Sequence, residues 1–148
     1  MKRVSERAFS PVISLLTVAS VWDAHLGAQL RDLRLTTRKY GLLAHIDATP
    51  GISFSELARR SQITVQSAHS AVQTLVADGL VADATAHAGA ASDLRVTDHG
   101  AEVLREVEQR LAALDAALSA GAPHLAAALE GLHEEPIGIE RAGSIQKG

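Results

Sequence analysis

The stretch ISFSELARRSQITVQSAHSAVQTLVADGLV, residues 52–81, decides the fold of this chain. Its early residues, Ser53-Phe54-Ser55-Glu56, form a capping-box sequence. In such a box the serine accepts a hydrogen bond from the backbone three residues on, and the glutamate bonds back to the N–H of the cap. Ile52 and Leu57 stand at the two positions of a hydrophobic staple around this cap. The pattern predicts a short helix from Phe54 to about Arg60.

A second, longer helix is predicted directly after the first. Residues 61–63 turn the chain, and Thr64 is a residue type that caps helices. Gly79 stands where a left-handed residue commonly ends a helix. Apolar residues recur at helical spacing along one face, at Val65, Ala68, Val72 and Leu75. A short helix, a tight turn and a longer helix predict a helix-turn-helix.

The opposite face of the second helix carries amide and hydroxyl side chains. Such groups form hydrogen bonds with base edges and with phosphates. We therefore expect this face to lie in the major groove of DNA. The residues expected to contact DNA from this helix and its cap are Thr64, Gln66, Ser67, His69, Ser70, Gln73 and Thr74.

Two shorter elements are predicted on either side of this stretch. Thr36 or Thr37 can cap a helix that runs through Asp47. After the extended pair Leu80-Val81, the small residues 82–92 lead to Leu94-Arg95-Val96, which is typical of a return strand. The two strands predict a β-hairpin wing.

Two motifs in this order resemble the MarR (multiple-antibiotic-resistance regulator) family. The first combines residues 54–58, 63–67 and 75–81, and the second is Val96-Thr97-Asp98-His99-Gly100, at the exit of the wing. The resemblance covers roughly residues 33–118. It implies a winged helix-turn-helix transcriptional regulator, dimeric with two winged heads. Many members of the family bind aromatic acids or phenols.

Long amphipathic helices are predicted at both ends of the chain. The first runs from Phe9 to Leu33, with its apolar stripe at Val12, Leu15, Ala19, Trp22, Leu26 and Leu33, broadened by Leu16 and Leu30. Thr97 caps the second, which reaches about Ala120 with a seam of Leu104, Val107, Leu111, Leu114 and Leu118. Gly121 ends it, and Pro123 begins a last helix to about Leu132. A small head cannot cover both stripes, so we expect a symmetric homodimer with interlocking terminal helices.

The predicted fold class is mainly α with a small β-hairpin wing, a winged helix-turn-helix with long N- and C-terminal dimerisation helices. We expect residues 1–34 and 98–133 to form the helical dimerisation region and residues 35–97 to form the head. Together they would make a single intertwined domain per chain. Residues 134–148 form a C-terminal tail, either a mobile terminus or an arm docked on a partner.

Composition bounds the class of protein. The 148 residues include no cysteine, which excludes disulfides, thiolate nucleophiles and zinc–thiolate sites. No apolar run of about eighteen residues is present, so no membrane span is expected. The N-terminus lacks a signal-peptide pattern, and we expect a cytoplasmic protein. The seven histidines form no i, i+4 pair, and no catalytic motif is present. A metal site, a cofactor and an enzymatic activity are not expected.

The distribution of charge complicates a DNA-binding function. The net charge is −3, and residues 51–100 carry three basic and five acidic groups. The basic excess lies in the first fifty residues, around Arg31, Arg34, Arg38 and Lys39. This cluster is either a solvated charge run or a source of phosphate contacts. The basic residues expected to contact DNA are Arg38, Arg59, Arg60 and Arg95. The wing tip, Ala88-Gly89-Ala90, has no basic residue at all.

Trp22 is the only tryptophan and lies on the apolar stripe of the first helix. It either packs in the dimer core or forms the wall of a small-molecule pocket. The resemblance implies an aromatic acid or a phenol as the ligand, and an arginine pairs bidentately with a carboxylate. The residues proposed for this pocket are Trp22, His25, Arg31 and Tyr40.

The sequence thus favours a homodimeric, ligand-responsive transcriptional regulator on a pseudo-palindromic operator. Each subunit would meet one half-site, with the half-sites about one helical turn apart. The alternative from another class is a ligand-binding or protein-interaction dimer of the same fold with weak or lost DNA binding. A continuous positive stripe across both heads would favour the regulator.

Overall fold

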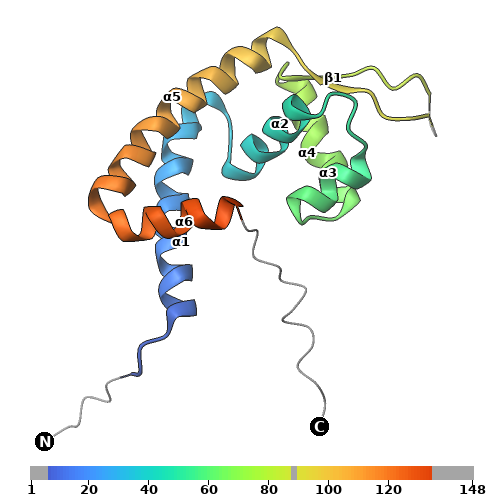
Figure 1. The fold of residues 1–148 in the computed structure, drawn as a ribbon. Coiled ribbons are helices and arrows are strands. Elements are labelled where there is room, and N and C mark those ends of the chain that lie inside the picture. The colour runs from blue at the N-terminus through green and yellow to red at the C-terminus, as the bar shows by residue number, and fades with distance from the viewer. Residues whose placement is uncertain (1–6, 88–89, 135–148) are drawn as a thin grey trace, which may run out of the picture. The chain divides into compact units, whose positions relative to one another are not determined.

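The computed structural model describes residues 7–87 and 90–134 of the chain (Figure 1). Its contacts divide the chain into two compact units, Met1–Arg110 and Leu111–Gly148. Helix α5, Asp98–Gly121, runs through this division, so its first half belongs to the first unit and its second half to the second. The predictions for Ala88, Gly89 and the tail after residue 134 lie outside the described residues.

The described elements confirm a mainly α fold with a two-stranded wing. The strands pair antiparallel, with Val81 opposite Val96 and Asp83 opposite Leu94. The elements in chain order are α1 Pro11–Leu30, η1 Arg31–Leu33 (a 3-10 turn), α2 Thr37–Ala48, α3 Phe54–Ser61, α4 Val65–Ala77, β1 Val81–Asp83, β2 Leu94–Val96, α5 and α6 Pro123–Glu134.

Four predicted N-caps are confirmed. The hydroxyls of Thr36, Ser53, Thr64 and Thr97 each accept a hydrogen bond from the N–H three residues on, at 3.2, 3.1, 3.1 and 3.0 Å respectively. The second half of the predicted capping box is wrong, because the Glu56 carboxylate does not return to the N–H of Ser53. It accepts N–H bonds from two arginines instead. Bonds from a guanidinium to a carboxylate are charge-assisted at both ends and outcompete one to a neutral amide.

The helix ends are fixed by left-handed residues. Gly79, at φ 75°, follows α4 as predicted, and the N–H of Leu80 bonds back to the Leu75 carbonyl at 2.9 Å. This is a Schellman motif. Gln62 and Arg34 take the left-handed position after α3 and η1, at φ 55° and 56°. The turn between α3 and α4 is therefore set by its own backbone hydrogen bonds.

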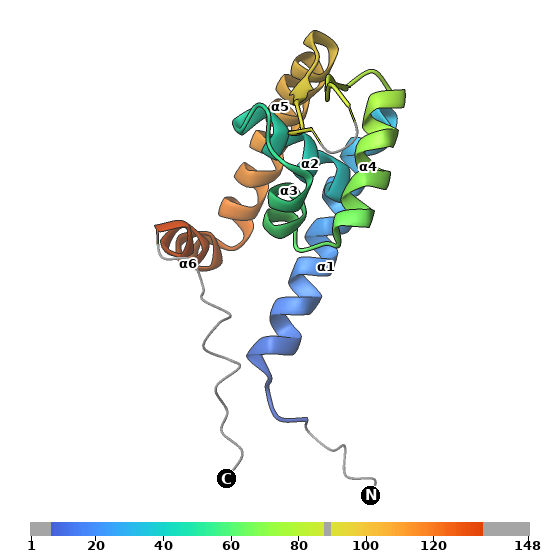
Figure 2. The same ribbon diagram turned by 90° about the vertical axis from the view of Figure 1, so that its right-hand side faces the viewer.

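The core of the first unit lies between α2, α3, α4 and the hairpin. Helix α2 contacts α3, α4 and β2, and α4 contacts β1. Figure 2 shows α3 and α4 beside α2. The fully enclosed large side chains of this core are Leu30, Leu42, Leu43, Ile46, Leu57, Val72, Leu75, Val81, Leu94 and Val107. Helix α1 contributes only its last residue to this set.

Helix α1 differs from the prediction in two respects. It ends at Leu30, and the final turn to Leu33 is a 3-10 turn. This turn is closed by the N–H of Arg34, which bonds to the Arg31 carbonyl at 3.1 Å, and the N–H of Leu35 bonds back to the Leu30 carbonyl at 3.2 Å. A single stripe is also too narrow a description, since at 100° per residue the apolar side chains of residues 11–21 point all round the helix. The exposed ones include Val12, Ile13, Leu15, Leu16 and Val21.

We expect another protein surface to bury these side chains, because large exposed apolar surfaces mark interaction sites. Residues 11–33 are also long and apolar enough, by length and composition alone, to cross a membrane. The helix contains no unbroken apolar run of about eighteen residues, because Asp23 interrupts it, but its mean hydropathy is high enough for a span. The helix of a subunit interface and a membrane span therefore pass the same compositional test.

The second unit contains the end of α5 and the whole of α6. The predicted break between them is confirmed, since α5 ends at Gly121 and α6 begins at Pro123. The seam residues Leu111, Leu114 and Leu118 are half-buried. Leu129 and Leu132 of α6 are exposed. The unit therefore leaves apolar surface uncovered.

The start of α5 is docked on the end of α4 through backbone contacts. The Thr97 hydroxyl donates to the Gly79 carbonyl at 2.6 Å and accepts from the N–H of Gly100 at 3.0 Å. The N–H of Thr97 donates to the Leu80 carbonyl at 3.0 Å. A Cβ at Gly100 would lie 2.2 Å from the Leu80 oxygen and 2.7 Å from a Val96 methyl. Only glycine fits at this position.

Gly100→Ala should therefore lower the free energy of unfolding by about 1–3 kcal/mol, the usual range for a forced overlap in a packed site. Gly41→Ala is the matched control, because nothing lies within 4 Å of the added methyl in α2. That change should raise stability by about 0.5–1 kcal/mol through helix propensity. Urea unfolding followed by circular dichroism measures both, and equal effects would contradict the close approach.

Candidate nucleic-acid interface

Helix α4 presents an uncharged polar face to solvent. Its sequence, VQSAHSAVQTLVA, contains no lysine, arginine, aspartate or glutamate. Ala68, Val72 and Leu75 are buried, which fixes the rotation of the helix about its axis. The exposed side chains of the outer face are Gln66, Ser67, His69, Ser70, Gln73 and Thr74. The sequence therefore predicted the exposed polar face of α4 correctly, but Val65, which was predicted on the apolar face, is exposed as well.

A groove of about 420 Å³ runs along one side of this face. We call it the recognition groove, and it is lined by Arg38, Thr64, Gln66, Ser67, Ser70, Ala71 and Thr74. The fold thus brings Arg38, from the first turn of α2, beside the helix whose own residues are all uncharged. The Thr64 hydroxyl donates to the Ser67 hydroxyl at 2.9 Å. Six of the residues expected to contact DNA meet in this groove.

His69 lies on the other edge of α4 and does not line the recognition groove. Its ring stacks on Phe54, with centroids 3.7 Å apart and an interplanar angle of 20°. Both residues line a second hollow of about 530 Å³ together with wing residues such as Asp83 and Thr85. This aromatic pair joins the two helices of the helix-turn-helix on the side that faces the wing.

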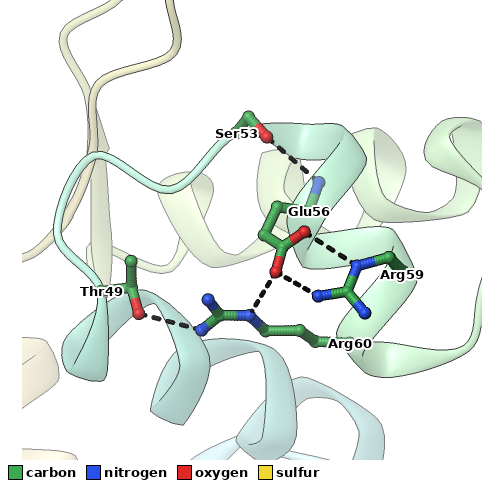
Figure 3. A network of polar contacts seen from close by, with 5 residues as sticks. All are labelled: Thr49, Ser53, Glu56, Arg59 and Arg60. Atoms are coloured by element: carbon green, nitrogen blue, oxygen red, sulfur yellow. Dashed lines mark hydrogen bonds and ion pairs between the residues drawn. The ribbon is translucent and has the colours of Figure 1, made fainter.

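The two arginines at the end of α3 are held by one carboxylate (Figure 3). Glu56 accepts from Arg59 through Nε at 2.9 Å and Nη2 at 2.5 Å, and from the Nε of Arg60 at 2.8 Å. Arg60 also donates to the Thr49 hydroxyl at 3.0 Å. The Arg59 and Arg60 guanidinium groups hold the pKa of Glu56 down, to about 2. Both residues expected to contact phosphate are thus already paired within the protein.

Arg95, the remaining predicted contact, is paired in the same way. Its Nε donates to the Asp93 carboxylate at 2.8 Å, and it stands on β2 rather than at the tip of the wing. Every arginine between residues 51 and 100 therefore has an acidic partner. The positive charge of the head that has no such ion pair among the described residues lies in α2, at Arg38 and Lys39.

Arg110 is a structural residue that the sequence analysis missed. It donates to the Gln29 carbonyl at 2.5 Å, to both Asp32 carboxylate oxygens at 2.6 and 3.0 Å, and to Glu106 at 2.9 Å. Arg110 lowers the pKa of Asp32, and Asp32 and Glu106 raise the pKa of Arg110. The only sequence signal was the i, i+4 spacing from Glu106. The contact ties α5 to the end of α1.

A larger pocket, of about 900 Å³, lies between α1 and α2. We call it the α1–α2 pocket, and its lining includes Asp23, Gly27, Arg31, Arg34, Thr36, Thr37, Arg38, His45 and Ser61. Of the four residues proposed for a ligand site, Arg31 lines it. Trp22 and His25 lie against each other instead, with ring centroids 5.4 Å apart, and neither they nor Tyr40 are among its lining residues. The Ser61 hydroxyl is buried with no hydrogen-bond partner among the described residues.

Acidic and histidine side chains do not gather into a metal site in the described residues. No group of three His, Cys, Asp or Glu side chains there could hold a metal ion. Arginines, hydroxyls and amides supply the polar chemistry of the recognition groove, and the α1–α2 pocket adds Asp23 and His45 to its arginines and hydroxyls. The arginines, hydroxyls and amides bind anions and form hydrogen bonds, and guanidinium groups match carboxylates and phosphates in geometry.

Comparison with known proteins supports the same fold. Residues 35–89 match the sequence profile of the MarR family. The MarR family protein Rv2887 of Mycobacterium tuberculosis, in complex with DNA, has a TM-score of 0.70 and 25% identity, over 86% of this chain and 97% of that one. Its complex with salicylic acid gives 0.66 and 27%, over the same shares.

A further solved structure resembles the chain in fold alone. Sco5413, a MarR family transcriptional regulator from Streptomyces coelicolor, has a TM-score of 0.71 at 22% identity, over 92% of this chain and 95% of that one. Among curated proteins, none matches the chain by sequence.

A helix-turn-helix followed directly by a paired hairpin defines the class, which is that of winged helix-turn-helix proteins. The profile match over the head and the likeness of the remaining helices narrow the class further. The head, residues 35–89, matches the MarR family, and the fold is that of solved MarR family proteins, as the two motifs predicted.

The Glu56 network predicts a specific response to acid. The ordinary pKa of the carboxyl is 4.5, and in the folded protein it is about 2. The stability that ionised Glu56 contributes is therefore complete above pH 4.5 and is lost as the pH falls through about 2.

Glu56→Gln should lower the Tm at neutral pH, and this difference from the unmodified protein should shrink below pH 4.5. Thermal melts at a series of pH values measure it. Glu102→Gln, on the exposed face of α5 outside the network, is the control. A Tm difference that stays constant down to about pH 2 would contradict the pairing.

Proposed function

We propose that the chain is a DNA-binding transcriptional regulator that acts as a homodimer and responds to a small aromatic acid or phenol. The observation that carries the proposal is the recognition groove, in which Arg38 joins the uncharged donors and acceptors of α4. A cation for phosphate beside polar groups for base edges is what duplex recognition needs. The DNA complex of Rv2887 supports it. An enzymatic activity is not proposed for this family member.

The composition of α4 indicates which bases it reads. Arginine and lysine recognise guanine, and α4 has neither. Glutamine pairs bidentately with adenine, and Gln66 and Gln73 are both exposed. They are seven residues apart, which is about 10.5 Å along the helix and about three base steps of duplex. Two A·T pairs about three steps apart are the expected core of each half-site.

Dimerisation would bury the apolar side chains of α1 that are exposed in the single chain. The apolar residues of its first turns are half or more exposed in the single chain, with Val12 at 64% and Leu16 at 59%. Figure 1 shows these turns extending away from α2, α3 and α4. A two-fold interface would bury them against the same surface of a second copy. This interpretation also accounts for the composition that α1 shares with membrane spans.

The α1–α2 pocket is the proposed effector site. Arg31, Arg34 and Arg38 line it together with the Ser61 hydroxyl, a lining suited to a carboxylate with a hydroxyl neighbour. The complex of Rv2887 with salicylic acid supports an effector of this class. Trp22 and His25 belong to α1 but not to the lining, so their part in the site remains a proposal.

Arg38 connects the two sites, because it lines both the α1–α2 pocket and the recognition groove. A guanidinium that pairs with a bound carboxylate is withdrawn from a DNA phosphate. The effector would then favour the conformations in which Arg38 faces the pocket, and the population that binds DNA would fall. The mechanism needs a side-chain movement in α2 in addition to any change in the spacing of the heads.

A second candidate function is favoured by one observation, which is that Arg59, Arg60 and Arg95 are paired with acidic residues. A head with so little unpaired positive charge suits a ligand-binding or protein-interaction dimer with weak or lost DNA binding. Selection of binding sites separates the two functions.

Selection from a random duplex pool should enrich inverted repeats with two A·T pairs about three steps apart in each half. Gln66→Ala should relax the choice at one of these pairs and Gln73→Ala at the other, each at a cost of about 1–3 kcal/mol in discrimination. Gln109→Ala, on α5, is the matched control. If no sequence is enriched even at low salt, the interaction dimer is the better description.

Salicylate should weaken duplex binding by the unmodified protein. Arg38→Gln should bind the duplex about 8-fold less tightly in 0.1 M salt for each phosphate that it no longer neutralises, and it should no longer respond to salicylate. Arg105→Gln, an exposed arginine of α5, is the control and should respond normally. Fluorescence anisotropy of a labelled duplex measures both effects. An unchanged response in Arg38→Gln would place the coupling elsewhere.

A further inference from the structure

The Glu56 network stands at the join between the two helices of the helix-turn-helix. Arg59 and Arg60 belong to the last turn of α3, and only residues 61–63 separate that turn from the cap of α4. In helix-turn-helix proteins the first helix crosses the DNA backbone while the second enters the groove. The two arginines are therefore the basic residues of α3 that a phosphate would meet.

The backbone of Glu56 and the side chain of Arg60 are each held by a further hydrogen bond. The backbone N–H of Glu56 donates to the Ser53 hydroxyl at 3.1 Å, so the residue is fixed in the first turn of the helix. Arg60 is fixed from its other side by Thr49, eleven residues away in sequence. Figure 3 shows the carboxylate between the two guanidinium groups. The network joins the end of α2 to both ends of α3.

Glu56 occupies the atoms that a phosphate would use. It takes the Nε–Nη2 edge of Arg59 bidentately, at 2.9 and 2.5 Å, which is the geometry in which arginine binds a phosphate. It also takes the Nε of Arg60. The three side chains together carry one positive charge in place of two. A phosphate must therefore displace Glu56 or bind through the remaining N–H groups at half the net charge.

We propose that Glu56 is an internal competitor of the DNA phosphates, which withholds Arg59 and Arg60 and so sets the affinity of the head for any duplex. The proposal rests on the proposed function for its biological meaning. Phosphate contacts are independent of sequence, so Glu56 lowers the affinity for operator and random DNA by the same factor. Discrimination is left to the uncharged face of α4.

Glu56→Gln tests the proposal, because the amide keeps the size of the side chain and removes its charge. Each additional phosphate neutralised should tighten binding about 8-fold at 0.1 M salt and steepen the slope of log K against log salt by about 0.9. One such phosphate per subunit gives about 60-fold and about 1.8 for a dimer. The ratio of operator to random affinity should not change. Circular dichroism checks that the variant is folded.

Two comparisons separate release of the arginines from a general loss of negative charge. Asp47→Asn removes an exposed carboxylate of α2 outside the network and should leave the slope unchanged. In the background Arg59→Gln with Arg60→Gln, the added change Glu56→Gln should no longer tighten binding. Equal tightening in that background, equal tightening by Asp47→Asn, or weaker binding by Glu56→Gln alone would each overturn the proposal.

Elution from heparin resin gives a readout that needs no operator. Glu56→Gln should elute at higher salt than the unmodified protein, and the variants without Arg59 and Arg60 should show no such shift. If no duplex is bound by any variant but the heparin shift is present, the proposed function fails and the competition stands. If the operator is bound and neither the slope nor the elution changes, the function stands and the competition is overturned.

Discussion

The approach of α5 to the end of α4 is the constraint on which the rest of the head depends. Gly100 lies so near the Leu80 carbonyl that no side chain fits, while Thr97 bonds to the backbone of Gly79 and Leu80. These contacts join the two ends of the wing, and they fix how the first turn of α5 lies against the end of α4. The two sequence motifs that resemble the MarR family therefore contact each other, because Gly79 and Leu80 belong to the first and Thr97 and Gly100 to the second.

Electrostatics determines how this head can meet DNA. The arginines at the end of α3 and on β2 are paired with Glu56 and Asp93, and α4 has no lysine, arginine or carboxylate. In the proposed complex with DNA, the contribution from sequence-independent attraction would accordingly be small, and hydrogen bonding by α4 would carry more of the recognition. Arg38 would then be the most important basic residue of the head for binding, because it is the arginine that lines both the recognition groove and the α1–α2 pocket.

A half-buried arginine links the head to the long helices. Arg110 holds Asp32 and the Gln29 carbonyl, where α1 passes into the 3-10 turn. The α1–α2 pocket includes Arg31 and Arg34, on either side of that aspartate. A ligand in this proposed effector site would lie against the segment that joins α1 to the head, and it could act directly on the position of α2 and of Arg38.

The sequence by itself determined the local elements. The caps at Ser53 and Thr64 and the stop at Gly79 depend on bonds within a few residues, so their residue types suffice to predict them. The pairs that Glu56 forms with Arg59 and Arg60 are also local, at i, i+3 and i, i+4 of one helix. Only the tertiary structure decided the partners that lie far apart in the sequence. Arg110 binds Asp32 across 78 residues, and Arg60 binds the Thr49 hydroxyl across eleven. Such pairings depend on which groups the folded chain brings within hydrogen-bond distance, and spacing along the sequence does not contain that information.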